Sequence, residues 1–199
     1  MRKRFCALMM TLVLLTGCSR GGQEMSRSAE ELALSIRAEY LAMTACFASV
    51  DITADYGQRV YEYSMSLSWQ KDGETKLTVT APENIAGISA RIQDGNSYLE
   101  YDGASLETGV LSGTGLSPIE VVPVAINYIL SGYIGECDFE TVDEQELLWF
   151  CCRDPECEPG VGTEAAFWFE PESHALKQAE MLSDGYCVVR CVFHDFTKE

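Results

Sequence analysis

The sequence predicts an α+β protein in which a curved antiparallel sheet, of about eight or more strands, is covered by two or so helices. Three observations support this fold class. Strand-like segments with alternating apolar and polar residues recur along the chain. Turn signals separate them at intervals of about eight to twelve residues. Two other segments carry apolar residues at helical spacing. The length of 199 residues suits one domain with its own hydrophobic core.

The N-terminus has the features of an export signal. Basic residues at positions 2–4 precede the apolar run Phe5–Leu15, which is too short to span a bilayer. Leu15-Thr16-Gly17-Cys18 then resembles a bacterial lipobox, in which the cysteine is acylated and becomes the mature N-terminus. The alternative is ordinary cleavage near Gly17, which would leave a free thiol at Cys18.

These features predict three regions. Residues 1–17 form a lipoprotein signal peptide, residues 18–27 a polar, glycine-rich flexible tether, and residues 28–199 the folded domain. Acyl chains such as palmitate on Cys18 would anchor the protein to the cell membrane, outside the cytoplasm.

The charge excludes one class of partner. The formal net charge is −17, and the export signal holds three bases and no acid. Residues 18–199 therefore have 11 bases and 31 acids, a formal charge of −20. Such a surface repels phosphate backbones, so nucleic-acid binding is not expected. Basic proteins, peptides or cations would fit as partners, although solubility alone also explains the charge.

The first half of the domain predicts one helix and the start of a meander. Ser28 and Glu31 have the spacing of a capping box, and apolar residues at helical spacing then continue to about Phe47. Five apolar residues alternate with polar ones from Tyr61 to Gln70, which is typical of a strand with one buried face. Further strands are expected at residues 77–81, 88–92 and 98–101.

The second half predicts a loop, a second helix and more strands. Residues 109–115 are rich in glycine but lack the ending of a phosphate-binding loop, so we expect an ordinary mobile loop. Ser117, Pro118 and Glu120 suggest a helix start, and Pro123 would either kink that helix or move its start further along. Gly132 ends this helix, and strands follow at residues 147–152, 166–170, 176–182 and 186–196.

The cysteines do not give a clear disulfide pattern. Nine cysteines are present, and seven are left when the signal peptide is removed and Cys18 is acylated, so at least one thiol is unpaired. Cys187 and Cys191 would lie about 13 Å apart on one strand, too far to bond to each other. Cys151, Cys152 and Cys157 lack the paired spacing of zinc sites. We expect buried thiols with one or two disulfides, and neither a metal nor a cofactor.

Two helices cannot cover the whole apolar face of so large a sheet. The uncovered part would form an apolar, aromatic-lined groove, the usual place for a hydrophobic ligand or a partner. The candidates for its lining are Tyr61, Tyr63, Trp69, Phe167 and Phe169. The alternative is that these side chains belong to the core.

The order of these features resembles the LolA/LolB-like lipoprotein superfamily. The resemblance covers residues 28–196 and rests on a Pro82–Gly87 break, a Tyr101–Gly103 turn, and the aromatic strand and turn of Phe167–Glu172. The last hairpin, with Asp184-Gly185 and Val192–Phe196, completes it.

The resemblance implies an incomplete antiparallel barrel wrapped around helices, with a hydrophobic cavity between them. It also implies carriage of lipids or lipoproteins, or a role as a partner in spore germination, as in the anchored GerS-type relatives that bind and activate a cell-wall amidase. The carrier LolA itself is soluble, so an anchor at Cys18 favours the anchored relatives. The arginine inside the carriers' cavity has only Arg59 and Arg91 as positional counterparts.

Catalysis has little support. No G-x-S-x-G, H-E-x-x-H or P-loop pattern occurs, and His174 and His194 lie in a turn and near the chain end. Two hypotheses follow. The protein is either an anchored carrier of an apolar ligand or lipoprotein, or a non-enzymatic interaction module of the cell envelope.

Overall fold

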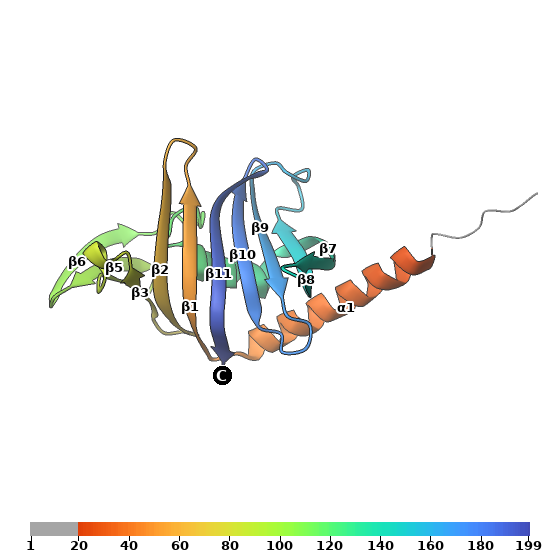
Figure 1. Ribbon diagram of the computed structural model, residues 1–199, viewed down its shortest axis with the longest axis horizontal. Coiled ribbons are helices and arrows are strands. Elements are labelled where there is room, and N and C mark those ends of the chain that lie inside the picture. The colour runs from red at the N-terminus through yellow and green to blue at the C-terminus, as the bar shows by residue number, and fades with distance from the viewer. Residues whose placement is uncertain (1–19) are drawn as a thin grey trace, which may run out of the picture.

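The computed structural model describes residues 20–199, with side chains from Ser28 onward. The expected signal peptide and Cys18 lie outside the described residues. Within the described part, an eleven-stranded antiparallel sheet carries α1 (Arg20–Ala42) and α2 (Val121–Ser131) on one face (Figure 1). We call the face with the helices the inner face and the other the outer face. The sheet is open, which confirms the predicted α+β class and the incomplete barrel.

The strands follow the chain in two meanders. The first comprises β1 (Ala45–Asp55), β2 (Val60–Gln70), β3 (Thr75–Ala81), β4 (Ser89–Gln93), β5 (Asn96–Tyr101) and β6 (Ala104–Val110), with the short 3-10 helix η1 (Glu83–Ile85) between β3 and β4. The second comprises β7 (Tyr133–Val142), β8 (Gln145–Arg153), β9 (Thr163–Phe169), β10 (Leu176–Ser183) and β11 (Tyr186–Lys198). Pairing of β1 with β11 joins the meanders, and β6 and β7 form the two edges.

The first helix differs from the prediction at both ends. In the described residues it comprises Arg20–Ala42, so Ser28 lies inside it, and residues 20–27 of the expected tether are helical. It ends at Ala42 rather than near Phe47, which lies in β1. The reason is that a period of two begins at Cys46 and continues to Ala54, burying every second side chain of β1. None of the helices in residues 20–199 is both long and apolar enough to cross a membrane.

The second helix starts later than a capping box at Ser117 would place it. Its first residue is Val121, and Ser117 lies in the turn before it, where its carbonyl accepts from the Val121 N–H at 2.9 Å. Pro123 is the third helical residue, where its missing N–H leaves no hydrogen bond unmade. The later start that Pro123 suggested is therefore confirmed.

Three strands were not predicted from the sequence. β1 was not recognised because the apolar residues before it have helical spacing, and because its own buried residues include small ones, such as Ala48 and Ala54, which make its alternation weak. β6 is almost wholly exposed and lacks an apolar face. Its last residues, Gly109 and Val110, belong to the stretch that was expected to be a loop. β7 carries acidic residues on its outer face and is interrupted by a bulge near Gly135.

Aromatic rings pack the helices onto the second meander. Phe150 stacks on Phe169 at a centroid distance of 5.2 Å, and Tyr40 of α1 meets the Phe169 ring edge-on at 5.5 Å. The two helices are linked by Arg37, whose Nε donates to the Ile129 carbonyl at 2.8 Å. Fully buried aromatic rings supply much of the apolar area of a core, so these contacts fix α1 on the sheet.

Polar contacts tie the C-terminal end of α1 to the end of β11. The Tyr40 hydroxyl donates to the His174 carbonyl at 3.0 Å, and Lys198 Nζ lies 2.8 Å from a Glu39 carboxylate oxygen. The hydrogen bond from Lys198 lowers the pKa of Glu39, with a further contribution from His174. Glu39 therefore stays ionised at neutral pH and holds the side chains of Lys198 and His174.

The seven cysteines of the described part are all free, so the one or two expected disulfides are not found among them. Cys46, Cys151, Cys152 and Cys191 are buried. Burial raises the pKa of Cys46 and Cys151 to about 12 and that of Cys152 to about 11. These thiols stay protonated at neutral pH and serve as small apolar side chains.

We expect Phe169→Ala to lower the free energy of unfolding by about 3–5 kcal/mol, because it opens a cavity where the ring contacts Tyr40 and Phe150. Urea unfolding followed by circular dichroism measures this. Leu106→Ala on exposed β6 is the control and should change stability by less than about 0.5 kcal/mol. Equal losses in both variants would contradict this description of the core.

Candidate functional site

The helices cover the inner face unevenly. α1 packs on β7 and β8, and α2 packs on β10 and β11. Figure 1 shows α1 at the β7 end of the sheet, away from β5 and β6. Over β2–β5, an apolar cavity of about 250 Å³ lies between the sheet and the segments that cross it. Its lining consists of Tyr63, Met65, Leu77, Val79, Ile85, Ile88, Ala90, Leu99, Ser117, Pro118 and Ile119.

The floor of the cavity belongs to a row of apolar side chains that crosses five strands. Strand pairing places Leu67 opposite Leu77, Leu77 opposite Ala90, Ala90 opposite Leu99, and Leu99 opposite Leu106. Residues in register across a sheet share one face. The exposed fraction rises along this row from 1% at Leu77 to 65% at Leu106. An apolar track thus leads from the core to the edge strand β6.

The roof of the cavity comes from two connections. Ile85 and Ile88 belong to the β3–β4 connection, which is held by hydrogen bonds of 2.8 Å between the backbones of Val79 and Ile88 and of Val79 and Gly87. Pro118 and Ile119 precede α2. Apart from the single turn of η1, both connections lack regular secondary structure, in contrast to the strands of the floor.

The segment before α2 is fastened at several points. The buried carboxylate of Glu120 accepts hydrogen bonds from the backbone N–H and the hydroxyl of Ser112. The Tyr56 hydroxyl donates to the Leu116 carbonyl at 3.1 Å. Gly115 has φ +72°, and an added Cβ would lie 2.9 Å from Met181 and 3.0 Å from Val124. The segment can lie this close to β10 and α2 because position 115 has no side chain.

The structure separates the five expected groove residues. Tyr63 lines the cavity. Tyr61 is on the same strand but lies near the β1–β2 turn, 38% exposed, with its ring 6.1 Å from Tyr56. Trp69, Phe167 and Phe169 are buried in the core cluster and do not line the cavity.

Neither arginine considered above lies in the cavity. Arg91 has an ion pair with Glu100 at 2.8 Å and lies over the Tyr98 ring, 4.3 Å from its centroid. Arg59 belongs to the exposed β1–β2 turn. Among the described residues, the cavity lining therefore includes no arginine of the kind expected from the carriers.

Of the residues that line the cavity, only Tyr63 was predicted from the sequence as a groove residue, although the alternating pattern placed several others on strands. Leu77, Val79, Ala90 and Leu99 all follow the period of two that predicted their strands. The alternating pattern did not show which strands have no helix packed on their inner face. Ile88 was expected in the strand at residues 88–92 and lies directly before β4 (Ser89–Gln93). Ile85 lies in a connection whose course over the sheet depends on tertiary packing.

The cavity is suited to hydrocarbon. Apart from the hydroxyls of Tyr63 and Ser117, the described side chains in its lining are apolar. Burying a methylene group in such surroundings contributes about 0.8 kcal/mol. Within residues 20–199, no group of three or more acidic, cysteine or histidine side chains is arranged to hold a metal ion.

Comparisons with known proteins give a likeness of fold. No protein-family model matches the chain, and no curated protein matches it. An uncharacterized conserved protein from Thermus thermophilus has a similar structure, with a TM-score of 0.50 at 10% identity, covering 86% of this chain and 88% of that one.

Two further solved structures are similar at lower scores. The Mycobacterium tuberculosis lipoprotein LppX has a TM-score of 0.48 at 16% identity, covering 89% of this chain and 96% of that one. A LolA superfamily protein from Nitrosomonas europaea has a TM-score of 0.41 at 11% identity, covering 88% and 94%. At these identities, the likeness to all three structures concerns the fold alone.

We expect Gly115→Ala to destabilise the protein by about 2–4 kcal/mol, because the new methyl group meets Met181 and Val124 in addition to the strain of a positive φ. Gly113→Ala is the matched control. Its φ of +75° is nearly the same, but no atom lies within 4 Å of the added Cβ, so a loss of about 1 kcal/mol is expected. Urea unfolding measures both. A loss at Gly115 no larger than at Gly113 would show that the segment is not closely packed.

Proposed function

We propose that the protein is an extracytoplasmic lipoprotein without enzymatic activity that binds an apolar ligand, such as part of an acyl chain, on the inner face of its sheet. The observation that carries this proposal is the apolar cavity over β2–β5. A lining of this composition favours hydrocarbon over any polar ligand.

The size of the cavity limits how much of a ligand it holds. About 250 Å³ is slightly below the range of sites for drug-sized molecules. One acyl chain would enter in part, and the remainder would follow the apolar row past Leu99 to the exposed Leu106. Movement of the roof at Ile85 and Ile119 would admit more of it.

The anchor is the second part of the proposal. The basic start, the apolar run and the Leu15–Cys18 lipobox occur together and in order, which favours acylation of Cys18. Two or three acyl chains hold a protein on a membrane surface, where one does not. A tethered binding domain would work close to the membrane that supplies or receives its ligand.

A second candidate function is an interaction module for an envelope protein, such as the GerS-type role. Two observations favour it. The cavity is small, and on the inner face of the second meander the rings of Phe150, Phe167 and Phe169 occupy the space that a larger ligand would need. In this case the exposed edge strand β6 would pair with a strand of the partner.

Filling the cavity tests the ligand. We expect Ala90→Phe to weaken binding of a fluorescent fatty acid by at least about tenfold, since its ring would occupy the space between Leu77 and Leu99. Ser66→Phe, which adds the same ring on the outer face of β2, should leave the affinity unchanged. Fluorescence titration of folded variants measures both. An unliganded wild-type protein that does not take up the probe would favour the interaction module instead.

Removal of the lipobox cysteine tests the anchor. Cys18→Ala should move the protein from the membrane fraction to the soluble fraction of its host, because the acceptor of the acyl chains is gone. Fractionation followed by immunoblotting measures this. Retention in the membrane fraction would refute lipidation at Cys18, and Cys157→Ala, a cysteine outside the lipobox, serves as the control.

A further inference from the structure

The outer face of the second meander contains a pocket that the proposed function does not use. Over β1 and β2 the outer face is polar, with Asp51, Thr53 and Ser64 in neighbouring positions. Over β7–β10 it instead carries a small apolar cluster, separate from the main core. This cluster consists of Leu147, Ala166 and Trp168, with Val142, Trp149 and Leu182 packed against it.

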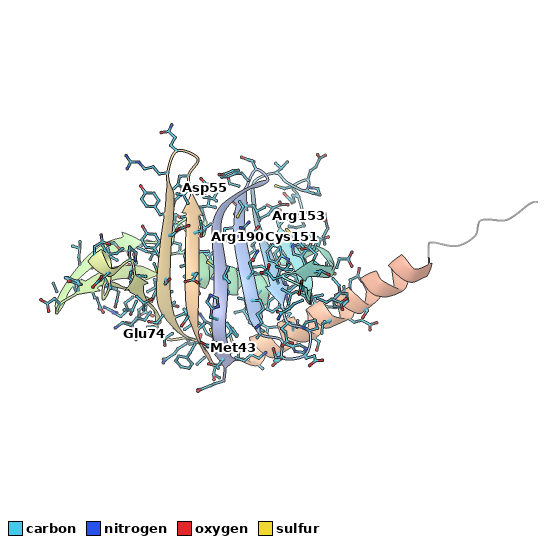
Figure 2. All side chains as sticks on the ribbon, viewed as in Figure 1. Met43, Asp55, Glu74, Cys151, Arg153 and Arg190 are labelled. Carbon is cyan, nitrogen blue, oxygen red and sulfur yellow. The ribbon has the colours of Figure 1, made fainter. Side chains whose placement is uncertain are left out.

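Four residues of this cluster, Trp149, Ala166, Trp168 and Leu182, form the floor of a cavity of about 290 Å³. Trp149 and Trp168 are directly opposite each other on β8 and β9. The β8–β9 connection borders the cavity through Pro159 and Gly160. Figure 2 labels Cys151 and Arg153, which also line it, at this side of the sheet. Two indole rings in one pocket offer the aromatic surface that attracts cations.

Four carboxylates surround this floor, and only two of them have a cationic partner in the described part of the chain. Arg153 lies 3.1 Å from Glu136, and Arg190 lies 2.7 Å from Glu180. Glu140 accepts a hydrogen bond from Trp168 Nε1 at 2.8 Å. Neither Glu140 nor Glu164 has an ion-pair partner among residues 28–199.

Glu164 is the unusual member of this group. Only 6% of its surface is exposed, and one oxygen accepts from the Gly160 backbone N–H at 2.9 Å. Glutamate is rarely buried to this extent without a cation, since removing a carboxylate from water costs several kcal/mol. Glu164 lines the cavity with one hydrogen bond, from a backbone N–H, and no cation of the described residues pairs with it, so its carboxylate can accept a hydrogen bond from a cation bound there.

The arrangement of the carboxylates argues against a metal ion. A metal needs several oxygen ligands around one point. In the described residues no three acidic, cysteine or histidine side chains are close enough to provide this. A larger cation with an apolar body can contact the separated carboxylates and the indole rings together. Ammonium and guanidinium groups on a hydrocarbon stem have this form.

We propose that the cavity on the outer face, with Trp149, Trp168, Glu140 and Glu164, is a binding site for an organic cation with an ammonium or guanidinium head. The indole rings contact the apolar body and the face of the head group. Glu164 and Glu140 neutralise its charge. The net charge of the chain attracts such a cation from solution. The site is on the opposite face from the apolar cavity, so either can exist without the other.

The test uses the full chain in a non-ionic detergent and the fluorescence of its tryptophans. Two of the three tryptophans of the chain lie in the cavity, and the third, Trp69, is in the core. Choline and acetyl-arginine amide are the probes, titrated to about 10 mM. The neutral isostere of choline, 3,3-dimethylbutanol, is the ligand control. We expect a saturable change with at least one cation and none with the isostere.

The variants show where the cation binds. Glu164→Gln keeps the acceptor for the Gly160 N–H but removes the charge, and should weaken binding by at least about tenfold. Glu107→Gln removes one charge from exposed β6 and should leave the affinity unchanged. Thermal unfolding checks that both variants are folded. Trp149→Leu, which keeps an apolar side chain, should also weaken binding, as measured by calorimetry.

Each outcome decides the proposal. Preference for choline would identify a free quaternary ammonium compound as the natural ligand class, and preference for acetyl-arginine amide would identify a side chain of a basic protein. The absence of a saturable response to both cations would overturn the proposal. So would equal affinities in Glu164→Gln and Glu107→Gln, or equally tight binding of the neutral isostere.

Discussion

The structure depends on how the apolar inner face of a wide sheet is kept from water. Every strand except β5, β6 and β7 has buried apolar side chains, but α1 and α2 lie over the second meander and the centre of the sheet. Where they lie, the rings of Tyr40, Phe150 and Phe169 fill the space between helix and sheet. Over β2–β5, where neither helix lies, only short connections cross the strands, and the space that they do not fill is the cavity. The position of the helices therefore decides which part of the face is core and which part is a site.

Much of the architecture could be predicted from the sequence, because alternation of apolar and polar residues is a local property. It identified β2 from Tyr61 to Gln70 and most later strands. It failed where alternation is weak or overlaps another period, as at β1, where Ala48 and Ala54 are small and follow a helical pattern. It also could not distinguish Tyr63, which lines the cavity, from Trp69 on the same face of the same strand. That difference arises from the β3–β4 connection and the segment before α2, which cross the sheet over Tyr63. Their path depends on tertiary packing, which a local pattern in one sequence does not reveal.

The pleat of the sheet separates two kinds of chemistry within a few residues. In β8, Phe150 and Cys152 point to the inner core, while Trp149 and Cys151 belong to the outer cavity. The inner side is suited to hydrocarbon, and the outer side combines aromatic rings with carboxylates. The acidic character of the chain is thus not only a matter of solubility. In one place it is concentrated around indole rings and a buried glutamate.

The pairing of β1 with β11 has a consequence for how the protein forms. Each meander is built from neighbours in sequence, but their junction brings Val50 beside Phe193 across nearly the whole domain. Contacts between such distant residues carry a large cost in loop-closure entropy and are made late in folding. Until β11 arrives, β1 is an unprotected edge whose inner side chains, such as Val50 and Ile52, are apolar. A chain synthesised from its N-terminus therefore exposes the apolar edge strand β1 until β11 has been made. Pairing of this edge with other incompletely folded copies is the hazard that such an order of assembly creates.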